Sequence, residues 1–261
     1  FIDWRSIFNH RAAILGFYIF VVLLLLLTYF TAPVIRNTRS WLTIGSFQFQ
    51  PVELAKIALI FVYASFFSRR HLSVARLKYI FQSFLFFILP AGLTLLQPDL
   101  GSASVLFGIW FVFLLISGLP RKRVITGFVI LAILSVIGWS YFLQSYQRER
   151  IVSVFYPERD VLGINYSVTQ SKIAIGSAGF WGKGYNQGTQ TQLGFLTEPA
   201  TDFIFSALTE EWGIFVGLLI LGAFLFLIFN ILKIGLLATQ NFEKFVCAGA
   251  VIVFGSQFLL N

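Results

Sequence analysis

Long apolar runs separated by short polar segments dominate the chain. Such runs predict membrane-spanning helices, because a hydrocarbon core about 30 Å thick requires roughly 20 apolar residues. We expect seven helices, over residues 12–30, 52–68, 80–96, 103–119, 124–143, 213–232 and 245–260. The pattern therefore predicts an all-α fold, a polytopic transmembrane helical bundle that forms a single membrane domain over residues 1–261.

A long polar segment, residues 144–212, separates the fifth and sixth expected helices. It is large enough to form a loop with its own structure outside the bilayer. Residues 167–175 have the composition of a short helix, and six glycines within 176–194 predict turns with exposed backbone. Exposed backbone amides suit the binding of a polar group.

The composition excludes a soluble domain. Hydrophobic residues make up 57% of the 261 residues and charged residues 11%, whereas a soluble domain carries about a quarter charged residues. The single cysteine, Cys247, allows no disulfide within the chain and is typical of a buried thiol. The chain contains no methionine, so we expect it to be part of a longer protein.

The basic residues predict which side of the membrane each loop faces. Positive residues in short loops mark the cytoplasmic side. Eleven of the nineteen lysines and arginines lie in short segments on one side: Arg5, Arg11, Arg69, Arg70, Arg76, Lys78, Arg121, Lys122, Arg123, Lys233 and Lys244. The segment 144–212 is therefore expected outside the cytoplasm. This distribution also accounts for the net charge of +8 without nucleic acid as a partner.

Asp202 is the leading catalytic candidate, because it lies where the polar segment meets the sixth expected helix. Carboxylates at the edge of a membrane span are costly and mark functional sites. A carboxylate before a helix is also a common N-cap. Glu198, Glu210 and Glu211 lie nearby in the sequence, and clustered acids either create a general base or hold a divalent cation. The spacing leaves these interpretations open.

Polar residues at the ends of the earlier helices form a second candidate group. Glu53 and Lys56 lie three residues apart at the start of the second helix. They either form an ion pair or border a polar cavity, with Arg39 available for a phosphate. Gln97 and Asp99 flank the turn before the fourth helix, where Asp99 also suits a helix cap.

The polar segment adds Gln170, Lys172 and Lys183 beside several glycines. This composition suits a pyrophosphate or a sugar, but it lacks the spacing of a nucleotide-binding loop. His10 and His71 both fall on the expected cytoplasmic side. Histidine catalysis and a histidine metal site outside the cytoplasm are therefore excluded, so chemistry there depends on carboxylates.

Several motifs together give the chain a family resemblance. They are residues 39–42 (RSWL), 50–56 (QPVELAK), 97–101 (QPDLG), 146–150 (YQRER), 170–177 (QSKIAIGS) and 201–205 (TDFIF). In this order they resemble the SEDS proteins (shape, elongation, division and sporulation), and the elongation member RodA more than the division member FtsW. The resemblance implies ten spans, of which these seven match the third to the ninth. The family's PExHTD reads TEPATD at 197–202, which removes a histidine beside Asp202.

The resemblance implies a peptidoglycan glycosyltransferase of the bacterial cytoplasmic membrane. Such enzymes polymerise lipid II during cell elongation, with the lipid tails between apolar helices and a class B penicillin-binding protein as partner. The family's invariant aspartate falls on Asp202, which is then the catalytic base. Arg39, Lys56 or a divalent cation, Mg²⁺ or Mn²⁺, offsets the charge of the leaving pyrophosphate, so a cofactor is expected only in the last case. The resemblance places the family's Arg, Glu and Lys on Arg39, Glu53 and Lys56. Together with Gln97, Asp99, Gln170, Lys172, Lys183 and Glu198, these are the expected substrate-binding residues.

Two other functions are considered beside this one. Polar residues within the spans, Glu53, Lys56 and Gln97, would also line a path for flipping lipid II across the membrane. Transporters of that kind commonly carry inverted repeats, and this sequence has none that we detect. A membrane scaffold that docks a partner without catalysis is the other alternative.

Overall fold

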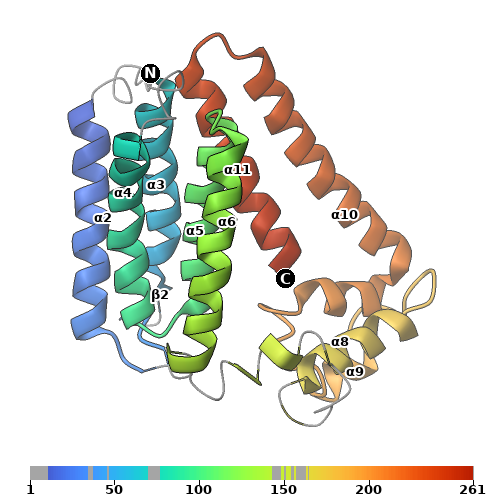
Figure 1. Ribbon diagram of the computed structural model, residues 1–261. Coiled ribbons are helices and arrows are strands. Elements are labelled where there is room, and N and C mark those ends of the chain that lie inside the picture. The colour runs from blue at the N-terminus through green and yellow to red at the C-terminus, as the bar shows by residue number, and fades with distance from the viewer. Residues whose placement is uncertain are drawn as a thin grey trace. The chain divides into compact units, whose positions relative to one another are not determined.

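The computed structural model describes residues 11–34, 38–45, 47–69, 77–142, 148–149, 151–153, 156, 163 and 165–260. Helices account for most of these residues, as the apolar runs predict (Figure 1). The chain divides into two compact units, residues 1–124 with 228–260 and residues 125–227. The polar segment 144–212 belongs to the second unit.

Each of the seven predicted helices is present. They are α2 (Arg11–Thr31), α3 (Pro51–Ser68), α4 (Leu77–Leu96), α5 (Leu100–Ile116), α6 (Arg121–Ile137), α10 (Ile204–Leu237) and α11 (Asn241–Leu260). Most ends fall within a few residues of expectation, but α10 begins at Ile204 rather than 213. Within the described residues, five helices are long and apolar enough to cross a membrane: α2, α3, α4, α6 with its extension, and α10. Helix α5, with 17 residues, is shorter.

Helix α3 is the centre of the first unit. It contacts α2, α4, α5 and α11, and 67% of its most apolar window is buried, compared with 28% for α2 and for α4. A helix that is apolar all round is buried by its neighbours, and α3 is apolar on nearly all sides from Ile57 to Phe67. Pro51 at its first turn suits a helix start, because that position needs no backbone donor.

Aromatic rings fill the contact between α3, α5 and α11. The ring of Phe113 lies 5.5 Å from that of Tyr63, 6.1 Å from Phe67 and 5.9 Å from Phe245. Tyr63, Phe67 and Phe113 are fully buried. Aromatic pairs at such distances add about 0.5–1.5 kcal/mol each to the burial of their surface, so this cluster holds three helices that are distant in sequence.

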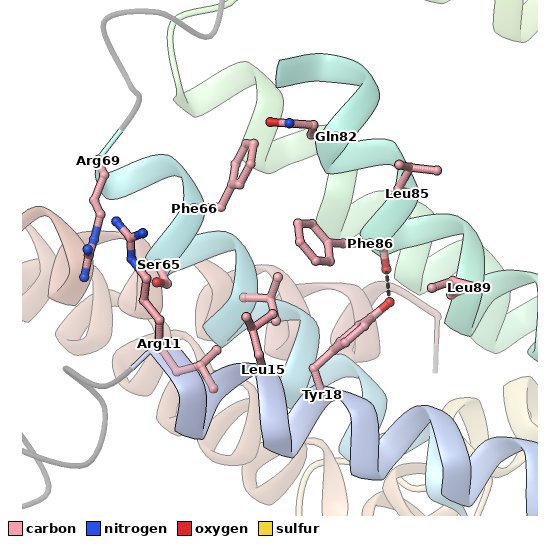
Figure 2. Close-up of a pocket in the computed structure, with 12 residues that line it drawn as sticks. Arg11, Leu15, Tyr18, Ser65, Phe66, Arg69, Gln82, Leu85, Phe86 and Leu89 are labelled. Carbon is pink, nitrogen blue, oxygen red and sulfur yellow. Dashed lines mark hydrogen bonds between the residues drawn. The ribbon is translucent and has the colours of Figure 1, made fainter. Parts of the chain in front are cut away.

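Pro90 lies inside α4 and removes one backbone donor from that helix. The carbonyl of Phe86, four residues earlier, would lose its usual partner. The hydroxyl of Tyr18 on α2 donates to this carbonyl at 2.8 Å (Figure 2). In an apolar environment an unpaired carbonyl is costly, so this bond both compensates for the proline and ties α2 to α4.

A short hairpin precedes α3 and was not predicted from the sequence. Strand β1 (Leu42–Ile44) pairs antiparallel with β2 (Phe47–Phe49), and Gly45 in the turn has φ 62°. Glycine adopts this left-handed conformation without steric cost. Strands of three residues carry too little periodicity to be detected beside long apolar helices.

The second unit contains the shorter elements around the start of α10. Helix α6 continues into a π-helical turn, η1 (Gly138–Phe142). Helix α8 (Tyr166–Ser177) confirms the short helix expected over 167–175, and α9 (Thr189–Gln192) is a single turn. Between them, Gly179, Gly182 and Gly184 have positive φ, as the predicted turns require.

Close packing of α11 on α3 gives the first testable prediction. A Cβ at Gly249 would lie 2.5 Å from Cγ2 of Ile60 and 3.1 Å from Cζ of Phe113, whereas a Cβ at Gly255 meets nothing within 4 Å. We expect Gly249→Ala to lower the free energy of unfolding by about 1–3 kcal/mol through overpacking. Gly255→Ala, on the same helix, should instead be neutral or stabilising by up to about 1 kcal/mol.

Thermal unfolding of the purified full-length protein measures both effects. Equal shifts for the two variants would contradict the packing that the structure describes between α3 and α11.

Candidate functional site

The polar segment of the second unit is built around a break in α10. At Gly213 the backbone has φ 88° and ψ 168°, which no helix adopts. A break frees backbone donors and acceptors that need partners in an apolar environment. The segment 179–184 supplies them in four hydrogen bonds: Lys183 N to Glu210 O (3.0 Å), Gly184 N to Glu211 O (3.0 Å), Ile214 N to Gly179 O (3.0 Å) and Phe215 N to Phe180 O (3.4 Å).

Two glycines allow this backbone pairing. Gly182 and Gly213 have φ 81° and 88°, a region that residues with a Cβ rarely occupy. A Cβ at Gly182 would collide with the carbonyl of Glu211, and one at Gly213 with the carbonyl of Phe180. The glycines are therefore needed both for conformation and for the close approach of the two segments.

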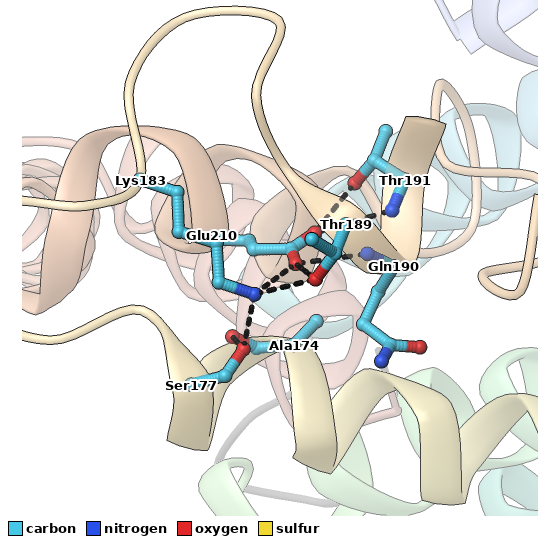
Figure 3. Close-up of polar contacts among 7 residues, drawn as sticks. All are labelled: Ala174, Ser177, Lys183, Thr189, Gln190, Thr191 and Glu210. Carbon is cyan, nitrogen blue, oxygen red and sulfur yellow. Dashed lines mark hydrogen bonds and ion pairs between the residues drawn. The ribbon is translucent and has the colours of Figure 1, made fainter. Parts of the chain in front are cut away.

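Glu210 lies next to the break and is fully buried. Figure 3 shows its carboxylate surrounded by donors from the polar segment. Oε1 accepts hydrogen bonds from Lys183 Nζ (2.7 Å), Thr189 Oγ1 (3.2 Å) and Gln190 N (2.9 Å), and Oε2 accepts from Thr191 N (3.2 Å) and Thr191 Oγ1 (3.0 Å). A buried charge requires such a complete set of partners. The carboxylate thereby fixes the turn 188–191 against α10.

Lys183 is the counter-ion of this cluster. Its ammonium group donates to Ser177 Oγ at 2.8 Å, to Thr189 Oγ1 at 2.7 Å and to Glu210 Oε1 at 2.7 Å. An ammonium group has three donors, and all three are used within the protein. This geometry makes Lys183 part of the architecture of the polar segment.

Asp202 lies in a turn immediately before α10. The carbonyl of Glu198 accepts hydrogen bonds from Thr201 N at 3.2 Å and Phe203 N at 3.3 Å, and Glu198 itself has φ 51°. Asp202 is exposed, and α10 begins two residues later, at Ile204. The turn therefore presents the carboxylate to the surroundings of the second unit.

Helix α8 is tied to the same region. Ser171 Oγ lies 2.6 Å from Ser206 Oγ on α10, and Ser167 Oγ lies 2.5 Å from Thr197 Oγ1. On α8, Lys172 is exposed and Gln170 is half-buried. The structure thus places both predicted residues on a helix that is hydrogen-bonded to the segment carrying Asp202.

In the first unit, polar side chains join the start of α3 to the start of α5 and the end of α4 to α2. Asp99 caps α5: its Oδ1 accepts from Ser102 N at 3.0 Å and its Oδ2 from Ser102 Oγ at 2.8 Å. Gln50 Nε2 also donates to Asp99 Oδ2 at 3.2 Å. Gln97 is buried and donates through Nε2 to the carbonyl of Leu25 at 2.9 Å. The capping interpretation of Asp99 is confirmed.

Glu53 and Lys56 form the expected ion pair within α3. Lys56 Nζ lies 2.8 Å from Oε1 and 2.9 Å from Oε2 of Glu53. The lysine side chain is 6% exposed, whereas that of the glutamate is 45% exposed. Arg39 is exposed, and its backbone N–H donates to the carbonyl of Gln97 at 3.3 Å. Arg39 is therefore the cation of this group whose side chain is open to a ligand.

The acids near Asp202 do not gather into a metal site. Among the described residues, no three His, Cys, Asp or Glu side chains are close enough to hold a metal ion. Glu210 is instead occupied by Lys183, a role that the sequence did not reveal. The position of Glu210 next to an apolar run is the sequence feature that indicates this role, because an acid in an apolar helix requires a partner.

A comparison with protein families matches residues 2–261 to the model of the FtsW/RodA/SpoVE family, described as cell cycle proteins. The peptidoglycan glycosyltransferase MrdB of Escherichia coli K12 is 36% identical over 248 residues, which is 94% of this chain and 66% of that protein. The stage V sporulation protein E of Bacillus subtilis is 33% identical over 245 residues, or 93% and 66% of the two chains. The chain thus spans just under two thirds of these relatives.

Solved structures show the same fold. One is described as structural coordination of polymerization and crosslinking by a peptidoglycan synthase complex; it aligns with a TM-score of 0.78 at 30% identity, covering 98% of this chain and 70% of that one. Another is the rod shape determining protein RodA of Thermus thermophilus, with a TM-score of 0.65 at 27% identity, covering 100% and 67%.

The cluster around Glu210 gives a prediction about stability. Lys183→Met should lower the free energy of unfolding by about 3–5 kcal/mol, because it leaves a buried carboxylate without its counter-ion. Lys172→Met removes the same charge from an exposed position and should change stability by at most about 0.5 kcal/mol. Denaturant unfolding of the full-length protein measures the difference.

A second measurement locates the effect. In Lys183→Met, the backbone amides of Gln190 and Thr191 should exchange hydrogen faster, because their acceptor, Glu210, is no longer held in place. Adding Glu210→Gln should restore part of the stability by removing the unpaired charge. A Lys183→Met protein as stable as Lys172→Met would refute the role of Lys183 as the counter-ion of Glu210.

Proposed function

The chain belongs to the FtsW/RodA/SpoVE family, and from this premise we propose that the protein is a peptidoglycan glycosyltransferase. The proposed reaction is the polymerisation of lipid II into glycan strands at the outer face of the bacterial cytoplasmic membrane, during cell elongation. The observation that carries this proposal is the exposed Asp202, held in a tight turn at the start of an apolar helix. The names of its relatives, among them the E. coli glycosyltransferase, support the reaction class.

The proposed step is a glycosyl transfer with inversion. The Asp202 carboxylate takes the proton of the 4-hydroxyl of the acceptor sugar, and that oxygen forms a bond to the anomeric carbon of the other chain. The bond from this carbon to the pyrophosphate breaks, and undecaprenyl pyrophosphate leaves with the electron pair. One base suffices because the leaving group needs no protonation.

Exposed cations are proposed as ligands for the substrate. In the second unit, Lys172 on α8 is exposed and Gln170 beside it is half-buried, so both are proposed contacts for sugar or phosphate oxygens. In the first unit, the guanidinium group of Arg39 is proposed to bind the pyrophosphate, since a guanidinium group pairs with phosphate through two parallel hydrogen bonds. Lys56 is paired with both carboxylate oxygens of Glu53, so its ammonium group is less available to the pyrophosphate than Arg39.

A divalent cation, Mg²⁺ or Mn²⁺, would neutralise the leaving pyrophosphate. The described residues contain no ready set of three ligands for such an ion.

We further propose that the protein works beside an enzyme that crosslinks the glycan product, a class B penicillin-binding protein. The support is the similarity to a structure described as coordinating polymerization and crosslinking in a synthase complex. The described residues do not identify the surface that such a partner would contact.

The test of the catalytic assignment is Asp202→Asn in the full-length protein, with its partner and purified lipid II in detergent. Loss of the base should reduce the rate of polymer formation at least about 100-fold. Because Asp202 is exposed, the thermal stability should stay within about 0.5 kcal/mol of the parent. Gel analysis of labelled glycan measures the polymer.

Glu243→Gln is the matched control, since it removes one carboxylate on α11 and should leave polymer formation unchanged. Polymer formation by Asp202→Asn at the parental rate would refute the assignment of Asp202 as the catalytic base. Absence of polymer from the parent protein, with lipid II supplied directly, would favour the flippase or scaffold alternatives.

A further inference from the structure

A cavity of about 420 Å³ opens in the first unit between α2, α3 and α4. It is distinct from every residue of the candidate site. The residues that line it are Arg11, Ile14, Leu15, Tyr18, Val62, Ser65, Phe66, Arg69, Gln82, Leu85, Phe86 and Leu89. Its volume lies in the range of about 300–1,000 Å³ that small-molecule sites occupy.

The lining changes from charged to apolar along the cavity. Arg11 is the first residue of α2, and Arg69 follows the last residue of α3. Figure 2 shows both arginines at one end of the cavity and Leu89 toward the other. Most of the lining between them is aliphatic or aromatic. A ligand that matches this lining has an anionic head and a long apolar tail.

The two arginines have no acidic counterpart in the part of the chain that the structure describes. The ion pairs found there join Lys56 to Glu53 and Lys183 to Glu210. Two guanidinium groups at one end of an apolar cavity repel each other unless an anion lies between them. A phosphate group satisfies both, because each guanidinium group offers a planar pair of donors.

The apolar part of the cavity opens to the surface of the first unit. Leu15, Leu85 and Leu89 are 42%, 46% and 53% exposed, although they belong to helices that are apolar enough to cross a bilayer. An acyl chain can therefore enter from the side and remain partly in the hydrocarbon. A free inorganic anion would leave these side chains without a partner.

We propose that this cavity binds an anionic phospholipid of the membrane. Its phosphate bridges Arg11 and Arg69, and one acyl chain lies along Leu15, Phe66 and Leu85. Basic pockets between transmembrane helices on the cytoplasmic side are typical sites for anionic lipid headgroups, and the basic loops place the arginine end on that side. The proposal is independent of the glycosyltransferase activity.

The experiment uses the full-length protein in nanodiscs that contain equal amounts of phosphatidylglycerol and phosphatidylcholine. Native mass spectrometry measures the ratio of the two lipids that the released protein retains. The parent protein should retain phosphatidylglycerol preferentially. In Arg11→Gln/Arg69→Gln this ratio should fall at least about tenfold, because two charge-assisted contacts to the phosphate are lost.

Two variants separate this site from its alternatives. Lys78→Gln/Arg121→Gln removes the same charge outside the cavity and should keep the parental ratio. Ser65→Phe keeps both arginines but fills the cavity, and it should also lose the preference, since the acyl chain has no room.

Three results would overturn the proposal. An equal loss in both double variants would mean that surface charge alone attracts the lipid. A parental ratio in Ser65→Phe would mean that no acyl chain lies in the cavity. A parent protein without any preference for phosphatidylglycerol would mean that the cavity does not select an anionic phospholipid.

Discussion

The structure of the polar segment depends on one constraint: an apolar environment offers no water to backbone groups, so each must find a partner within the protein. Helix α10 breaks at Gly213, and the donors and acceptors freed there pair with residues 179–184. Glu210, beside the break, then binds the next turn of the segment through Lys183, Thr189 and Thr191. A long loop rich in glycine thus acquires a defined conformation from a defect in a membrane helix.

The same constraint explains most of the polar residues in the first unit. Tyr18 compensates for the donor that Pro90 lacks, Gln97 donates to a backbone carbonyl of α2, and Asp99 caps α5. In an apolar protein such residues are as prominent in the sequence as catalytic ones, because both are costly to bury. Exposure separates the two groups: Gln97 is buried and Asp99 is half-buried, whereas the side chains of Asp202 and Arg39 are exposed.

Backbone hydrogen bonds shape the turn that carries Asp202. The family's usual histidine is Ala200 in this chain. The carbonyl of Glu198 accepts hydrogen bonds from Thr201 and Phe203, and these bonds involve the backbone alone. In the same turn the Thr201 hydroxyl also donates to the Glu198 carboxylate at 3.4 Å, so backbone and side-chain contacts together shape the segment before α10.

The sequence by itself determined the helices, the short helix α8 and the cap at Asp99, because apolar runs, glycine spacing and capping residues act locally. It also marked Glu53 and Lys56 as partners, since residues three apart on a helix are neighbours. Only the tertiary structure decided three features: the ion pair of Lys183 with Glu210, the start of α10 at Ile204, and the hydrogen bond from the Tyr18 hydroxyl to the carbonyl of Phe86 in α4. The ion pair and the hydrogen bond join residues from separate elements, and the pairing of such residues is set by how the elements pack.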